Sequence, residues 1–153
     1  MTKSPIESLQ DLVRLDTDAI LAYDQAIAAC EHDFIADQLR EFRADHGHHV
    51  RDLSEELRKL GEEPDVRTDA KGFIIEKFTA ITSRGTRSAL IAMLANENLT
   101  AGIYSAAVEI EDLPDSAKAV IQQNYADEER HQSWISNALD QKIWERREQP
   151  AAR

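Results

Sequence analysis

Two pairs of residues in this sequence have the spacing that places an acid and a histidine on one side of a helix. Asp45 and His48 form the first pair, and Glu128 and His131 form the second. Residues three apart are neighbours on a helix surface, so each pair projects in one direction. One such pair is a weak signal, but its recurrence in the second half of the chain predicts that the two imidazoles and two carboxylates act together.

A lone carboxylate interrupts an apolar stripe upstream of each pair. Asp16 is this carboxylate in the first half of the chain, and Glu97 is its counterpart in the second half. A tyrosine follows each of them at the same spacing, Tyr23 after Asp16 and Tyr104 after Glu97. Positions at this spacing lie on the same face of a helix. The chain therefore contains two copies of one pattern, each with a lone carboxylate, a tyrosine and an acid–x–x–His pair.

The combined set contains four carboxylates and two imidazoles. Four carboxylates brought together in a protein core repel one another and lose hydration, and two divalent cations would neutralise them. This is the ligand set of di-iron and di-manganese carboxylate sites in helical bundles. Oxygen-rich ligation with one imidazole for each metal favours iron or manganese over a thiolate zinc site. The predicted metal ligands are Asp16, Asp45, His48, Glu97, Glu128 and His131.

Two alternatives remain at this stage. The first concerns the second helix, where His46 and His49 flank His48 and positions 42, 46, 49 and 53 form a seam of their own. His49 could replace His48 as the ligand, but the repeat favours His48. The second alternative is a metal-free core, in which hydrogen bonds alone satisfy the polar groups.

The elements that must position these residues are four long helices. Helical spacing of apolar residues predicts helices over about 5–30, 34–60, 87–111 and 115–146. Ser4, Pro5 and Glu7 are start signals for the first helix, and Gly61 followed by Pro64 is a stop signal for the second. We expect an all-α, antiparallel four-helix bundle of two helical hairpins. A long crossover over residues 62–86, with a short helical piece, would join them; residues 1–147 would form one domain and 148–153 a flexible tail.

Composition restricts the partners. The chain has 153 residues with 29 acids and 18 Lys plus Arg, a formal net charge of −11. This charge argues against general nucleic-acid binding and against adsorption to an anionic membrane. The sequence has one cysteine, no apolar signal-peptide core and no run of about 18 apolar residues. We therefore expect a cytoplasmic protein without a membrane span.

With these residues in view, the sequence resembles the ferritin-like superfamily of di-iron carboxylate proteins, in particular bacterioferritins and rubrerythrins. Residues 127–134, DEERHQSW, are similar to the D-E-E-x-H-x-x-W motif of the fourth bacterioferritin helix. The spacing from Asp16 to Tyr23 resembles the E-x6-Y of the first helix. The region from Gly72 to Tyr125 is also similar to uncharacterised bacterial ferritin-like bundle proteins.

The resemblance implies roles for individual residues. Asp16 and Glu97 would be terminal ligands, Asp45 and Glu128 would bridge two metals, and each histidine of the two pairs would bind one metal. Tyr23 and Tyr104 would orient the carboxylates and take part in catalysis. The family has Glu where this chain has Asp16 and Asp45. The bacterioferritin haem ligand is a Met at the position of His46, so no haem is expected.

Three functions follow as expectations. The first is an oxidoreductase of the ferroxidase or peroxidase type, which binds two Fe ions, or Mn ions, and reacts with O2 or peroxide. The second is iron storage in a cage, and the third is a metal-free helical interaction module. We expect a homo-oligomer, with a dimer favoured.

Overall fold

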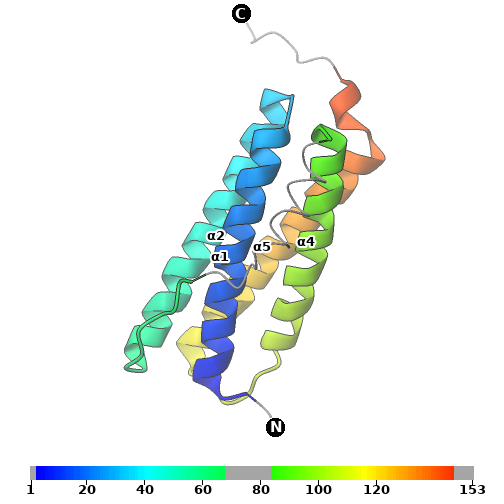
Figure 1. Cartoon of the computed structure of the whole chain (residues 1–153). Coiled ribbons are helices and arrows are strands. Elements are labelled where there is room, and N and C mark those ends of the chain that lie inside the picture. Colours follow the sequence, from blue (N-terminus) through cyan, green and yellow to red (C-terminus); the bar gives the residue numbers. More distant parts are fainter. Residues whose placement is uncertain (1–2, 68–83, 147–153) are drawn as a thin grey trace, which may run out of the picture.

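The structure is a computed structural model that describes residues 3–67 and 84–146, and within them it contains four long α-helices (Figure 1). A short 3-10 helix, η1, follows the last of them and spans Ile143–Glu145. The four long helices are α1 (Pro5–Ala29), α2 (Asp33–Lys59), α4 (Thr86–Ala107) and α5 (Asp115–Asp140). This arrangement confirms the predicted all-α four-helix bundle.

Local sequence signals explain the ends of the first two helices. The side chain of Ser4 accepts a hydrogen bond from the backbone N–H of Glu7, and the Glu7 carboxylate accepts one from the backbone N–H of Ser4. This reciprocal cap satisfies backbone donors that have no partner inside the helix. At the other boundary, Gly61 follows α2 with a φ of 82°, a left-handed conformation that glycine adopts without steric cost.

Neighbouring helices run antiparallel. In Figure 1, α1 and α2 form one hairpin and α4 and α5 form the other, with α1 against α4 and α2 against α5. The end of α2 and the start of α4 lie at opposite ends of the bundle. This is the order expected for two hairpins joined by a long crossover.

The core consists of two apolar clusters with a polar layer between them. One cluster includes Tyr23, Phe42 and Met93, and the other includes Leu9, Leu53 and Tyr104. Both draw side chains from all four helices. Burial of these side chains stabilises the bundle by about 25 cal/mol for each Å² removed from water. The polar layer is therefore enclosed by apolar packing on both sides along the bundle axis.

Two helices end earlier than predicted. α4 ends at Ala107 instead of near residue 111, because the chain turns to bury Leu113 in the second cluster. α5 ends at Asp140 instead of near residue 146, because Lys142 adopts a left-handed conformation with a φ of 49°. Neither glycine nor proline marks this stop, so no local signal predicts it.

Parts of the sequence-based prediction fall beyond the described residues. The crossover segment 68–83 and the tail 148–153 are both in this group. None of the described helices combines the length and the apolar character that crossing a membrane requires.

Candidate metal centre

Six ligand-type side chains form the polar layer at the middle of the bundle. All six are at most 1% exposed. They fall into two groups of four, and within each group the candidate ligand atoms lie within 4.8 Å of one another. His46 and Glu128 belong to both groups. Asp16 and His49 complete the first group, and Glu97 and His131 complete the second.

The structure brings four of the six predicted ligands together. Asp16, Glu97, Glu128 and His131 all lie in the polar layer, one each from α1 and α4 and two from α5. Whether each of them binds a metal stays a prediction. Their placement follows from the buried faces of the helices, since Asp16 and Glu97 interrupt apolar stripes of α1 and α4, and Glu128 and His131 lie on the buried stripe of α5 between Ile121 and Ile135.

The structure does not bring the other two predicted ligands, Asp45 and His48, into either group. His48 is exposed, and Asp45 lies at the edge of the layer with 23% of its side chain exposed. His46 and His49 take the inward positions of α2. The inward-facing positions of α2 are therefore each one residue later than predicted. The buried face of α2 follows the alternative seam through His46 and His49.

Burial along α2 and α5 shows how the two halves of the chain correspond. Buried positions 35, 39, 42, 46, 49 and 53 of α2 match buried positions 117, 121, 124, 128, 131 and 135 of α5 in the same order and at the same intervals. His46 is thus the counterpart of Glu128, and His49 is the counterpart of His131. The seam through 42, 46, 49 and 53 was the sequence signal for His46.

The two tyrosines cross between the hairpins. The Tyr23 hydroxyl on α1 donates to the Glu97 carboxylate on α4, and the Tyr104 hydroxyl on α4 donates to Asp16 on α1. Burial and the neighbouring carboxylates raise the pKa of both tyrosines well above 10.0, so both stay protonated donors. Each tyrosine therefore fixes the carboxylate of the opposite hairpin. A catalytic role for them stays a prediction.

The Nε2 atoms of His131 and His49 each contact an aspartate of the other helix of the α2–α5 pair. His131 Nε2 lies 2.8 Å from Asp45 Oδ2, and His49 Nε2 lies 2.9 Å from Asp127 Oδ2. The guanidinium of Arg130 contacts both aspartates, at 2.6 Å from Asp45 and 3.3 Å from Asp127. Partners of this kind fix the ring orientation and the tautomer of metal-binding histidines. The arrangement turns Nδ1 of each histidine towards the middle of the bundle.

Protons occupy this layer in the metal-free protein. Burial would raise the pKa of Asp16, but hydrogen bonds from His46 and His49 hold it below its usual range. Burial would also raise the pKa of Glu97, but the neighbouring side chains of Glu128, His131 and His46 lower it instead. Burial raises the pKa of Glu128 to about 10, with Glu97 and Asp16 adding to the effect and His46 opposing it. Glu128 is therefore protonated at neutral pH, while Asp16 and Glu97 are ionised.

Two buried atoms of the layer have no hydrogen-bond partner among the described residues. They are Glu128 Oε1 and His131 Nδ1. The second oxygen of Glu128 accepts a hydrogen bond of 3.0 Å from Thr100. Glu128 Oε1 lies 3.6 Å from His49 Nδ1 of the first ligand group, and His131 Nδ1 lies 3.5 Å from Glu97 Oε1 of the second. Buried polar atoms are almost always paired, so each of these two atoms is a candidate ligand atom for a cation in its own group.

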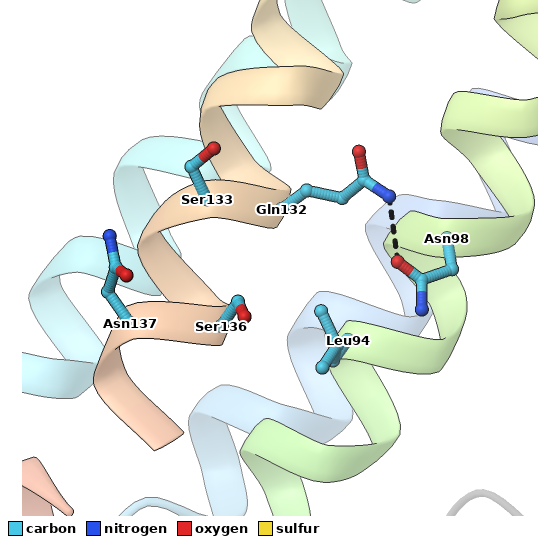
Figure 2. A pocket seen from close by; sticks show the side chains of 6 residues that line it. All are labelled: Leu94, Asn98, Gln132, Ser133, Ser136 and Asn137. Atoms are coloured by element: carbon cyan, nitrogen blue, oxygen red, sulfur yellow. Dashed lines mark hydrogen bonds between the residues drawn. The ribbon is translucent and has the colours of Figure 1, made fainter. Parts of the chain in front are cut away.

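A groove of about 390 Å³ lies on the surface between α4 and α5 (Figure 2). Gln132 and Asn98, which follow His131 and Glu97 in the sequence, join the two helices across it by a hydrogen bond of 2.7 Å. None of its lining residues belongs to the two ligand groups. They are Leu94, Asn98, Gln132, Ser133, Ser136 and Asn137.

A comparison with known families assigns the chain. The profile of a family described as a domain of unknown function (DUF2383) matches residues 4–109, and the chain belongs to this family. The matched region contains Asp16, His46, His49 and Glu97, but it ends before α5. No curated protein and no solved structure gives a significant match.

Proposed function

We propose that this protein binds two divalent metal ions in the polar layer and uses them to react with O2 or peroxide. The observation that carries the proposal is the pair of buried four-residue ligand groups that share His46 and Glu128. The unpaired Glu128 Oε1 and His131 Nδ1 support it, since each is a buried ligand-type atom without a hydrogen-bond partner among the described residues. The similarity of residues 127–134 to the bacterioferritin motif supports it further.

Each ion would have a ligand group of its own. The first would be held by Asp16, His46, His49 and Glu128, and the second by His46, Glu97, Glu128 and His131. Together the groups contain three carboxylates and three histidines, one carboxylate fewer than expected from the sequence. Imidazole suits iron, whereas carboxylate-rich sites suit manganese. The third histidine in place of a fourth carboxylate therefore favours iron over manganese.

The chemistry that the two ions would supply is electron transfer to an oxidant. Two bound Fe(II) ions would supply the two electrons that, with two protons, reduce one hydrogen peroxide to two waters. The chain's own contribution is to hold the ions, orient the carboxylates through Tyr23 and Tyr104, and exclude bulk water by the apolar clusters on both sides. The proposed class is a ferroxidase or a peroxidase.

Anaerobic titration with Fe(II) tests the proposal. We expect about two Fe(II) ions for each chain, as counted by elemental analysis after gel filtration. Addition of hydrogen peroxide to the loaded protein should consume about one peroxide for every two ions. The control is the metal-free protein under the same conditions. Absence of bound Fe(II) would reject the metal centre, whereas bound Fe(II) without peroxide consumption would reject only the reaction.

The adjacent residues His48 and His49 offer a matched pair of variants. We expect His49→Ala to weaken Fe(II) or Co(II) binding at the first ligand group by more than about tenfold, since even changes to residues that support ligands cost about 10–100-fold. His48→Ala should leave binding within about twofold of wild type, because His48 is exposed. Isothermal titration with Co(II) measures both. Equal losses in the two variants would contradict the assignment of α2.

A metal-free helical module is the second candidate, and one observation favours it. His46 already joins two carboxylates, with Nδ1 at 2.7 Å from Asp16 Oδ1 and Nε2 at 3.3 Å from Glu97 Oε1. A protonated His46 would thus act as an internal cation. Thermal unfolding separates the candidates, since a ligand that binds only the native state raises the melting temperature. An unchanged melting temperature with excess Co(II) and Mn(II) would favour the metal-free module.

A further inference from the structure

His46 lies at the centre of the polar layer. Its ring centroid is 5.2 Å from that of His49 in the first ligand group and 5.2 Å from that of His131 in the second, and His46 itself belongs to both groups. The side chain is fully buried, and the ring of Tyr23 packs against it at 5.3 Å between centroids. Close packing of this kind leaves the imidazole little freedom to rotate away.

The two nitrogens of His46 face different ligand groups. Nδ1 lies 2.7 Å from Asp16 Oδ1 and 3.5 Å from Glu128 Oε1, on the side of the first group. Nε2 lies 3.3 Å from Glu97 Oε1, which belongs only to the second group. A terminal ligand would present one nitrogen to a metal and keep its other nitrogen for an outer partner, as His49 and His131 do with the two aspartates. Within the described residues, both nitrogens of His46 instead face carboxylates of the layer.

We propose that His46 is a bridging ligand, with Nδ1 bound to the metal of the first group and Nε2 bound to the metal of the second. This inference rests on the proposed function and specifies how the two metals are joined. Its counterpart in the other hairpin, Glu128, also belongs to both groups, and its Oε1 lies 3.6 Å from His49 Nδ1 while its Oε2 lies 3.9 Å from His131 Nδ1. The layer would then have one imidazole bridge from α2 and one carboxylate bridge from α5.

The charges of the layer agree with this assignment. A histidine that binds metals through both nitrogens gives up both N–H protons to solvent and becomes an imidazolate with one negative charge. The three carboxylates of the layer carry three negative charges when ionised. Together these four negative charges equal the charge of two divalent cations. Neutrality matters here because an uncompensated charge in a buried site is strongly unfavourable.

Anomalous scattering from crystals of the Co(II)-loaded protein tests the bridge. We expect two cobalt ions about 6 Å apart, one on each nitrogen of His46, because metal–nitrogen bonds of about 2.0 Å extend from separate corners of the ring. Two-metal sites without such a bridge have ions about 3.5–4 Å apart. The matched variant is His46→Glu, which replaces the imidazole by a second carboxylate. It should keep two ions and shorten their separation to about 3.5–4 Å.

The outcomes separate this inference from the proposed function. Two ions about 3.5–4 Å apart in the wild type, or a single ion on one nitrogen of His46, would overturn the bridge and leave metal binding intact. No bound cobalt in the wild type would reject the metal centre itself. X-ray absorption of the same samples in solution gives the separation independently. Circular dichroism of His46→Glu establishes that the variant is folded before its metals are counted.

Discussion

Glu128→Gln should abolish tight metal binding while leaving the metal-free protein nearly as stable as the wild type. Glu128 belongs to both ligand groups, so its loss affects both ions. A glutamine cannot supply an anionic bridge, and we expect the affinity for Co(II) or Fe(II) to fall by more than about 100-fold. Since Glu128 is protonated at neutral pH in the metal-free protein, a neutral side chain of the same shape fits the same surroundings. The free energy of unfolding should change by less than about 1 kcal/mol.

Glu97→Gln is the matched control, because it makes the same chemical change in the same layer. Glu97 is ionised in the metal-free protein and accepts hydrogen bonds from Tyr23 and His46. Removing its charge leaves the His46 imidazolium without one of its partners. Loss of one partner of a buried ion pair costs about 3–5 kcal/mol. The two variants should therefore both lose metal binding, but only Glu97→Gln should unfold at clearly lower denaturant concentration.

Urea unfolding of the metal-free proteins and Co(II) titration of the folded ones check both expectations. Equal destabilisation by the two substitutions would show that the proton does not reside on Glu128. Retention of two tightly bound ions by Glu128→Gln would contradict its place in the metal centre. The two measurements are independent, so the Co(II) titration can be interpreted even if the expected stabilities are not found.

The helices could be predicted from the sequence because their signals are local. The cap of Ser4 and Glu7, the stop at Gly61 and the apolar stripes each depend on residues within a few turns. The inward placement of Asp16 and Glu97 could be predicted for the same reason. Each is a single carboxylate within an apolar stripe, so it faces the core together with that stripe. These helices have no competing pattern at the site.

Local signals of this kind could not predict which face of α2 turns into the bundle. Asp45 and His48 match one pattern and His46 and His49 match another, shifted by a single position. Such a shift rotates a helix by about 100°, so the choice depends on which face meets α5. Tertiary packing decides it, through buried neighbours such as Phe42 and Leu53. The acid–x–x–His motif aligns Asp45 with Glu128, whereas burial aligns His46 with it.

The outer aspartates depend on contacts between helices, and no spacing within one helix reveals them. Asp45 on α2 holds a histidine of α5, and Asp127 on α5 holds a histidine of α2. The two aspartates immediately precede His46 and Glu128, so they are counterparts in the correspondence that burial defines. Asp45 thus has a place in the repeat, but its contact is with the outer nitrogen of His131. A pattern along one helix could identify the residue and not its partner.

Metal binding should strengthen as the pH rises. Burial would lower the pKa of His46 and His49, but the ionised carboxylates that they contact, Asp16 and Glu97 for His46 and Asp127 and Asp16 for His49, raise both above the ordinary 6.5. His46, whose pKa is raised well above 6.5, is therefore an imidazolium at neutral pH in the metal-free protein, and Glu128 is protonated. A metal must displace these protons, so its apparent affinity increases by up to about tenfold per pH unit for each proton released. We expect the logarithm of the Co(II) affinity to rise with pH at a slope of at least about two between about pH 6 and pH 8.

The stability of the metal-free protein should change in the opposite direction. The unfolded chain releases the protons of His46 and His49 near pH 6.5 and that of Glu128 near pH 4.5, whereas the folded protein keeps them to higher pH. The folded state therefore binds more protons above pH 6.5, and its stability falls by up to about 1.4 kcal/mol per pH unit for each group as the pH rises towards the folded pKa values. Below about pH 4.5 the sign reverses, because Asp16 and Glu97 have lowered pKa values and stability is lost as they are protonated.

Melting temperatures of the metal-free and Co(II)-loaded protein, measured across about pH 6 to pH 8, test both trends together. The metal-free protein should melt at lower temperature as the pH rises, and the increase in melting temperature caused by Co(II) should grow. Glu128→Gln provides the control, since it removes one of the titrating protons and should flatten the fall of the metal-free protein. A metal-free protein whose stability rises over this range would contradict the protonation of the layer. This opposition between proton and metal is the physical consequence of placing three carboxylates and three histidines in one buried layer, where either kind of cation can neutralise them.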